Sequence, residues 1–468
     1  MPVCRYFVAG ATVLIATCLV TRPVAARCVD EERPDMAADA AAAATAPAPA
    51  SAPSPTDPRV TLQGLVREAL QRSHAVGASR MLAEAAEFEI EEARAAKALQ
   101  ASLSGGLGPG GTRGNGVNEM AALQVRASLT VSQLLYDGGR TDRLTDWRTQ
   151  IAESARQGNL SAREQLALST VALALERSRF RQHVLVYGQY VRKMGCLVEA
   201  LDTIVKADRG RASELVQAKK SLQQAELSQA QAQSQSRQID IRLRRLVGDG
   251  LPGVEGLATV LLRVPEVQQL VADVEQSSEV AQISAQATAA QSYAQAVAAG
   301  AKPQLSWAVT GGARASTGGN SGKGGNSGNG GSGRAGDYSL GLTINVPLLS
   351  PGLAPASSAA QKRADAAAAQ RAEAVEARRF RVAEVHEQTL ASFDRLRRAG
   401  ALLRDTDQLR NFTLQQWQQL GRRSLFDVMA TEGEHYNLRI SYVNALHDGQ
   451  QLNALLLSLG RGVNEWLR

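Results

Sequence analysis

The stretch LQVRASLTVSQLLYDGGR, residues 123–140, carries the pattern that decides the fold. Apolar and polar side chains alternate from Leu123 to Ser132, which is the period of a β-strand. A strand between lipid and water needs one apolar and one polar face, although a half-buried strand of a soluble protein shows the same alternation. The alternation ends at Tyr136-Asp137-Gly138-Gly139, and a helical period begins at Arg140. We therefore predict a strand that turns directly into a helix.

A second strand and an earlier helix precede this stretch. The pattern is helical from Leu62 to Ala98 and then alternates from Leu99 to Ser104. The segment between the two alternating stretches, GGLGPGGTRGNG, is rich in glycine. We expect it to form a loop over residues 105–119. The predicted unit is thus helix–strand–loop–strand–helix.

The same order returns about 200 residues later. A helical pattern over 264–299 leads into a strand, a long Gly/Ser/Asn loop over 311–337 and a further strand. Before the loops, Gln100 aligns with Gln304. After them, Gly139 aligns with Gly352. The second strand-to-helix corner contains Pro347 and Gly352 but has no aromatic-Asp pair. A duplicated unit is the most informative pattern in this sequence.

Long helices complete each repeat. Helical patterns cover 140–206 and 356–420, and each would extend roughly 100 Å at 1.5 Å per residue. Shorter helices are expected at 213–247 and 424–459. A heptad with a spacing of three and four residues includes Met194 and Leu201. We divide the chain into a first repeat over 59–247 (strands near 99–108 and 121–135), a connector over 248–264, and a second repeat over 265–468 (strands near 303–312 and 337–348).

The N-terminus has the features of an export signal. Arg5 precedes an apolar run of about fifteen residues, and Val24-Ala25-Ala26 supplies the small residues of a cleavage site. We predict a signal peptide over 1–26 and a disordered Ala/Pro-rich lead over 27–58. A lipid anchor at Cys18 is a weaker alternative. We expect neither Cys28 nor Cys196 to form a structural disulfide.

Composition and motifs exclude several functions. The formal charge of +7 over 468 residues is modest, and Arg is mixed with Glu along the helices, so we expect no nucleic-acid partner. The five histidines show no metal-ligand spacing, and no nucleophile elbow, phosphate loop or zinc-protease motif occurs. We therefore predict no enzyme activity, no cofactor and no metal.

Two sets of corners resemble the TolC family of outer-membrane efflux and secretion proteins. One is the strand-to-helix corner Ser132–Arg140. The other is a helix-to-helix corner that occurs once per repeat, GRASEL at 210–215 and GRRSLFDV at 421–428. The resemblance implies a mainly α fold with membrane strands: three copies would form a twelve-stranded outer-membrane β-barrel on a long periplasmic α-helical barrel.

The resemblance also implies functional residues near the helix corners. Arg423, Asp427 and Glu214 would form the periplasmic gate, and a ring of three Asp427 carboxylates would favour cations. A periplasmic adaptor would contact the corner residues, which are Gly210, Ser213, Gly421 and Ser424. A local explanation stays open, in which glycine ends one helix, Ser424 caps the next and Asp427 occupies its first turn.

Within the family, the chain resembles a type I secretion duct that exports an adenylate cyclase-haemolysin toxin. The partners would be two further copies of the chain, a membrane-fusion adaptor, an inner-membrane ABC exporter reached through the adaptor, and outer-membrane lipid. A multidrug efflux outlet is an alternative, because the cargo is chosen by the inner-membrane pump. A coiled-coil adaptor without a pore is an alternative of another class.

Overall fold

The computed structural model describes residues 57–110, 113–114, 117–118, 122–253, 256–316, 333–420 and 422–468. The predicted signal peptide, the lead up to residue 56 and Gly421 lie outside the described residues. The chain divides into two compact units. The described part of the first is Arg179–Gln238 and Arg395–Asn444, and the second comprises Pro53–Ser178, Ile239–Asp394 and Ala445–Arg468.

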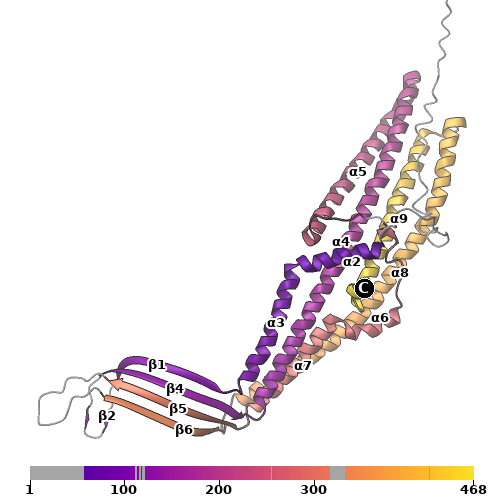
Figure 1. Cartoon of the computed structure of the whole chain (residues 1–468). Coiled ribbons are helices and arrows are strands. Elements are labelled where there is room, and N and C mark those ends of the chain that lie inside the picture. The colour runs from indigo at the N-terminus through magenta and orange to yellow at the C-terminus, as the bar shows by residue number, and fades with distance from the viewer. Residues whose placement is uncertain are drawn as a thin grey trace, which may run out of the picture. The chain divides into compact units, whose positions relative to one another are not determined.

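Four strands of the second unit form one antiparallel sheet (Figure 1). In spatial order they are β1 (Gln100–Gly110), β4 (Ala122–Tyr136), β5 (Gln304–Ser316) and β6 (Gly333–Asn345). Two short strands, β2 (Arg113–Gly114) and β3 (Val117–Asn118), pair with each other. The two hairpins of the two repeats therefore share one continuous sheet, joined through β4 and β5.

The register gives the sheet one polar and one apolar face. Thr130 pairs with Ser102 on β1 and with Thr310 on β5, so hydroxyl groups form a row across the strands. Because neighbouring residues in a strand point to opposite faces, Leu129 and its partner Leu103 lie on the other side. These two leucines are 50% and 78% exposed. The alternation predicted from the sequence is thus a property of the whole sheet.

The strands extend into segments that glycine content predicted to be loops. β1 continues through Gly105 to Gly110, and β5 continues through Gly311 to Ser316. The predictions of loops over all of 105–119 and 311–337 are therefore wrong at their ends. Each of these glycines pairs with a residue of the neighbouring strand, and the ladder hydrogen bonds outweigh the low strand propensity of glycine.

Each predicted helix before a hairpin is broken at a serine. Helices α2 (Pro58–Arg72) and α3 (His74–Ala95) meet end to end (Figure 1). The residue between them is Ser73, whose side chain accepts a hydrogen bond from Val76 N. In the second repeat, α6 (Val267–Asp273), the 3-10 turn η4 (Val274–Gln276) and α7 (Ser278–Ala299) are separated at Ser277. Ser73 lies 27 residues before Gln100, and Ser277 lies 27 residues before Gln304. The interruption is therefore part of the duplicated unit.

The long helices follow the hairpins as predicted. They are α4 (Arg140–Ala207) and α8 (Leu353–Leu420), and each is followed by a shorter helix, α5 (Ala212–Val247) or α9 (Leu425–Leu459). A last short helix, α10 (Val463–Leu467), ends the chain. Within the described ranges, no helix combines the length and apolar character needed to cross a membrane.

The connector between the repeats is built into the core of the second unit. Leu257, Val260 and Leu261 are buried in a cluster with residues of α2, α4, α5 and α9. Gln450 on α9 donates from Nε2 to the carbonyls of Leu257 and Val260, at 2.9 and 2.7 Å. The short turn η3 (Leu257–Thr259) lies in this segment. The connector is therefore packed and hydrogen-bonded.

Cys196 departs from the expectation for cysteines. It is disulfide-bonded, so the prediction that it would form no disulfide is wrong. Cys196 is the one cysteine in the described part of the chain.

Candidate functional site

The first strand-to-helix corner is closed by a buried carboxylate. Asp137 is 4% exposed; its Oδ1 accepts from Gly139 N at 3.0 Å and its Oδ2 from Thr141 N at 2.6 Å. Burial would raise the pKa of this carboxyl, but the hydrogen bonds from Thr141 and Gly139 and the charge of Lys97 outweigh it and hold the pKa below its usual value. Asp137 is therefore placed as an anion at the N-terminus of α4, where the helix dipole favours negative charge.

Two glycines make this turn possible. Gly138 and Gly139 have φ values of +68° and +85°, in the region that favours glycine. The side chain of Lys302 lies directly over Gly138, and its Nζ donates to the Gly138 carbonyl at 3.1 Å. Because Lys302 lies two residues before the start of β5, this contact ties the corner of the first repeat to the second hairpin.

The second strand-to-helix corner is built differently. It runs from Val346 to Gly352, between β6 and α8, and Leu353 N donates to Ser350 O at 3.0 Å. Leu348 and Leu349 are 91% and 90% exposed. No carboxylate occurs between Val346 and Gly352, so Pro347 and Gly352 mark a corner without the anionic cap of the first repeat.

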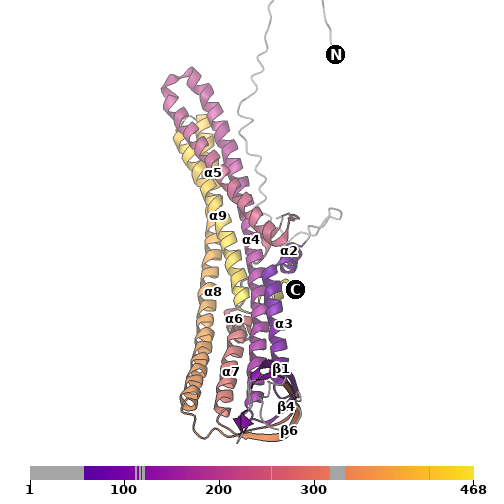
Figure 2. The same cartoon turned by 90° about the vertical axis from the view of Figure 1, so that its left-hand side faces the viewer.

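The first helix-to-helix corner is capped by a residue that the sequence analysis did not select. α4 ends at Ala207, and the 3-10 turn η2 (Arg209–Arg211) leads into α5 (Figure 2). The Asp208 side chain accepts from Gly210 N at 2.9 Å. Ser213 is the second residue of α5 and is exposed. The buried Oε2 of Glu214 has no hydrogen-bond partner among the described residues.

The second helix-to-helix corner contains a reciprocal cap. Asp427 N donates to Ser424 Oγ at 3.3 Å, and Ser424 N donates to Asp427 Oδ2 at 3.2 Å. This is the arrangement of a capping box at the start of α9. Arg423 donates from Nε to Gln416 Oε1 at 3.3 Å, and its Nη1 lies 4.0 Å from Asp427 Oδ2. The structure brings Arg423 and Asp427 together. In a single chain they contact nearby residues of the same corner, and their side chains are about half exposed.

Both helix corners pack against one apolar cluster of the first unit. Leu425, at the start of α9, is fully buried, and Leu215 and Trp417 pack beside it from α5 and α8. The heptad residues Met194 and Leu201 of α4 are also fully buried there. The two corners are therefore fixed against one another by packing within this unit, although Glu214 and Asp427 are not joined by any contact.

A buried charge cluster lies in the same unit and was missed by the sequence analysis. Glu432 on α9 is fully buried and pairs with Lys193 on α4 at 3.6 Å and with Arg410 on α8 at 3.7 Å. Arg410 also pairs with Asp407 at 2.8 Å. Burial and the nearby charge of Glu432 raise the pKa of Tyr190. The sequence pattern does indicate that Glu432 is buried, because it lies at helical spacing from the apolar Leu425 and Val428.

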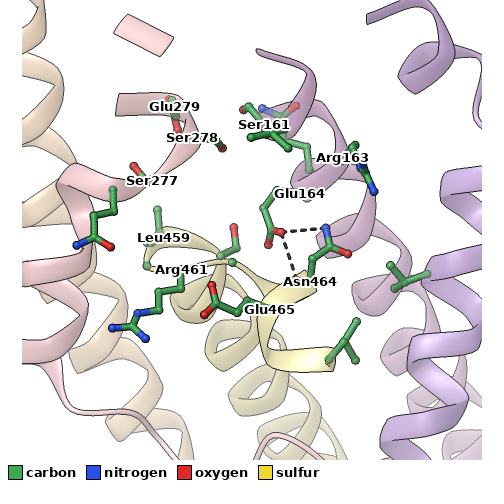
Figure 3. Close-up of a pocket in the computed structure, with 18 of the residues that line it drawn as sticks. Ser161, Arg163, Glu164, Ser277, Ser278, Glu279, Leu459, Arg461, Asn464 and Glu465 are labelled. Carbon is green, nitrogen blue, oxygen red and sulfur yellow. Dashed lines mark hydrogen bonds between the residues drawn. The ribbon is translucent and has the colours of Figure 1, made fainter. Parts of the chain in front are cut away.

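A pocket of about 760 Å³ opens in the second unit (Figure 3). Glu164 of α4 reaches into it, and its carboxylate accepts hydrogen bonds from Val463 N, Asn464 N and Asn464 Nδ2. Burial raises the pKa of Glu164 and outweighs these hydrogen bonds. Arg378 of α8 lines another wall and donates to the carbonyls of Ser458 and Leu459. Glu164 and Arg378 join the end of α9 and the start of α10 to the long helices. Their polar groups form the hydrogen bonds that make this connection.

Comparison with known proteins agrees with this architecture. Residues 65–249 match the model of the family described as outer membrane efflux protein. Proteins of that family are outer-membrane channels and not enzymes. No curated protein sequence matches the chain.

Solved structures show the same fold over most of the chain. CusC has a TM-score of 0.73 at 15% identity, covering 86% of this chain and 92% of its own. The outer membrane protein VceC from Vibrio cholerae has a TM-score of 0.72 at 17% identity, covering 86% and 96%. The MtrE outer membrane channel of Neisseria gonorrhoeae has a TM-score of 0.70 at 16% identity, covering 86% and 89%.

These similarities confirm the predicted fold class, which is mainly helical with a few antiparallel strands, as in the solved outer-membrane channels. The first repeat of this chain matches the outer membrane efflux protein family, and the chain as a whole has the fold of outer-membrane channels.

Proposed function

We propose that this chain is one protomer of a homotrimeric exit duct in the outer membrane, with its helices in the periplasm. The observation that carries the proposal is the sheet, which has one apolar face, one polar face and two edge strands, β1 and β6, each paired on one side only. Unpaired backbone groups cost several kcal/mol each in lipid, so a membrane sheet has to close. Pairing β1 of one copy with β6 of the next, three times, gives a closed barrel of twelve strands.

The partners follow from the helix corners. A periplasmic adaptor would contact the turns around Gly210, Ser213, Gly421 and Ser424, and an inner-membrane ABC exporter would be reached through the adaptor. The fixed geometry of the corners supports this, because Asp208 and Ser424 hold the two turns and the apolar cluster under Leu425 supports both. Site-specific crosslinking from Ser213 and Ser424 to the adaptor tests it, with partly exposed Ser228 on α5 as the control position.

The gate assignment is a second part of the proposal. Arg423 and Asp427 would line the narrow periplasmic end, and Glu214 would contribute from the first repeat. The buried Oε2 of Glu214, to which no described residue of the same chain donates, is available to a donor on a neighbouring copy. The exposed guanidinium of Arg423 is a donor of that kind.

We further propose that the cargo is a protein toxin, exported by a type I secretion system. The resemblance of the sequence to an adenylate cyclase-haemolysin duct supports this cargo. The family description as efflux proteins supports the alternative, an outlet for small drugs. The two make opposite predictions for a clean deletion: a toxin duct loses secretion and keeps drug resistance, whereas a drug outlet loses resistance and keeps secretion.

A coiled-coil adaptor without a pore is the competing structural role. It requires the exposed leucines of β1 and β4 to face water, which is unfavourable by about 25 cal/mol for each Å² of apolar area. Fractionation decides between the two. A duct is found in outer-membrane fractions as a heat-modifiable trimer, whereas a soluble, extended molecule would contradict the proposed function.

A further inference from the structure

The polar face of the sheet carries an unusual row of side chains near its loop end. The register places Gly106, Arg126, Arg314 and Ala335 side by side across β1, β4, β5 and β6. Arg126 and Arg314 are therefore direct cross-strand partners. Like charges directly opposite one another destabilise a strand pair, so local sheet stability does not account for this pairing.

The two guanidinium groups are exposed, and no carboxylate of the described residues forms an ion pair with either. Arg126 donates from Nη2 and Nε to Gln124 Oε1, at 2.7 and 3.2 Å, so a neutral amide on the same face orients it. Arg314 makes no hydrogen bond or ion pair with the described residues. The nearest carboxylate on this face, Asp337, lies one row away over Gly312 and forms no ion pair with either arginine.

The remaining described positions of the polar face carry no charge. They are mostly serine, threonine, glycine and glutamine, such as Ser104, Ser128 and Thr310. Gly106, next to Arg126, has nothing within 4 Å of where a Cβ would stand. The arginine row is thus an open, basic band on an otherwise neutral surface, with two positive charges and one negative charge per chain.

We propose that Arg126 and Arg314 form an electropositive collar around the lumen that selects anionic solutes. This inference rests on the proposed function, in which the polar face lines a closed barrel of three copies. Six guanidinium groups would then share one level of the pore, with three Asp337 carboxylates beside them. Rings of arginine or lysine favour anions in pores, and a confined lumen focuses their field. The solutes favoured would carry carboxylate or phosphate groups, including acidic stretches of an unfolded protein.

Ion selectivity measures this collar directly. Purified full-length protein is inserted into planar bilayers, and the chloride-to-potassium permeability ratio is obtained from the reversal potential in a KCl gradient. The double variant Arg126→Gln/Arg314→Gln should lower this ratio by roughly tenfold at low ionic strength. The effect should shrink in 1 M salt, where the Debye length is about 3 Å. Arg126→Lys/Arg314→Lys keeps the charges and should keep the ratio of the unsubstituted protein.

The outcomes separate the collar from the function on which it rests. If the unsubstituted protein forms no channel, the proposed function fails. If channels form and the glutamine variant has an unchanged ratio at low salt, the collar is wrong. Should the double variant not assemble into heat-modifiable trimers, Arg314→Gln alone gives the answer, because Arg314 has no described partner to lose. A ratio that falls equally in the lysine variant would also overturn the proposal, since charge would then not be the cause.

Discussion

The side chain of Asn453 holds the backbone of Leu261 in a left-handed conformation. Asn453 Nδ2 lies 2.6 Å from the Leu261 carbonyl and 2.9 Å from the Arg263 carbonyl. Leu261 has a φ of +59°, the one positive value among the described non-glycine residues. That conformation costs a leucine roughly 1–2 kcal/mol. A buried amide on α9 therefore offsets backbone strain where the two repeats are joined.

Replacing this amide should destabilise the protein markedly. Asn453→Ala leaves two carbonyls in a buried site without their donor, at a cost of about 1–3 kcal/mol each. We expect a lower midpoint in thermal denaturation followed by circular dichroism in detergent. Asn437→Ala, at an exposed position of the same helix, is the matched control and should change the midpoint little. Equal midpoints for the two variants would show that the amide does not hold the connector.

The buried charge cluster predicts that removing one charge lowers the stability of the protein strongly, and that removing a second charge restores part of the loss. Glu432→Ala would remove the buried carboxylate that pairs with Lys193 and Arg410, and breaking a buried pair typically costs about 3–5 kcal/mol. The double variant Lys193→Met/Glu432→Met removes both charges and should recover part of that loss. Glu84→Ala, from the exposed pair with Arg80, should cost less than about 1 kcal/mol. A double variant as unstable as the single one would contradict the electrostatic explanation.

The cap on α4 predicts a pH-dependent contribution to stability. Because the pKa of Asp137 is lowered in the folded chain, its contribution is present above the unfolded pKa and is lost as pH falls through the folded pKa. Asp137→Ala should cost about 1–2 kcal/mol at neutral pH. The difference from the unsubstituted protein should narrow in acid, below pH about 4. Asp137→Asn keeps one acceptor and should cost less, and a difference independent of pH would exclude the anionic cap.

The gate predicts altered conductance on substitution at the second helix corner. Arg423→Ser or Asp427→Ala should raise or alter single-channel conductance in planar bilayers, because each removes a charge from the narrow end. Ser424→Ala is the discriminating control, since it breaks the capping box and keeps both charges. If Asp427 acts only as a cap, Ser424→Ala and Asp427→Ala will behave alike. Unchanged conductance and cation selectivity in both charge variants would remove the gate assignment.

The candidate site was partly predictable from the sequence. The corner Asp137-Gly138-Gly139 has a local signal, because a tight turn into a helix needs those residue types at those positions. The capping role of Asp208 was not predicted, because a serine three residues after the corner glycine, as at Ser213 and Ser424, fits the local pattern of a helix cap equally well. The cluster around Glu432 depends on three helices whose contacts no local pattern specifies.

The sequence by itself determined the order of the elements, the duplication and the two-faced character of the strands. These follow from period, turn residues and repeated spacing, which act over a few residues. Only the tertiary structure decided that the strands continue through glycine-rich segments, that helices break at Ser73 and Ser277, and that Arg126 lies opposite Arg314. Those features depend on which strand or helix face lies next to another, and that is set by pairing and burial between segments distant in the chain.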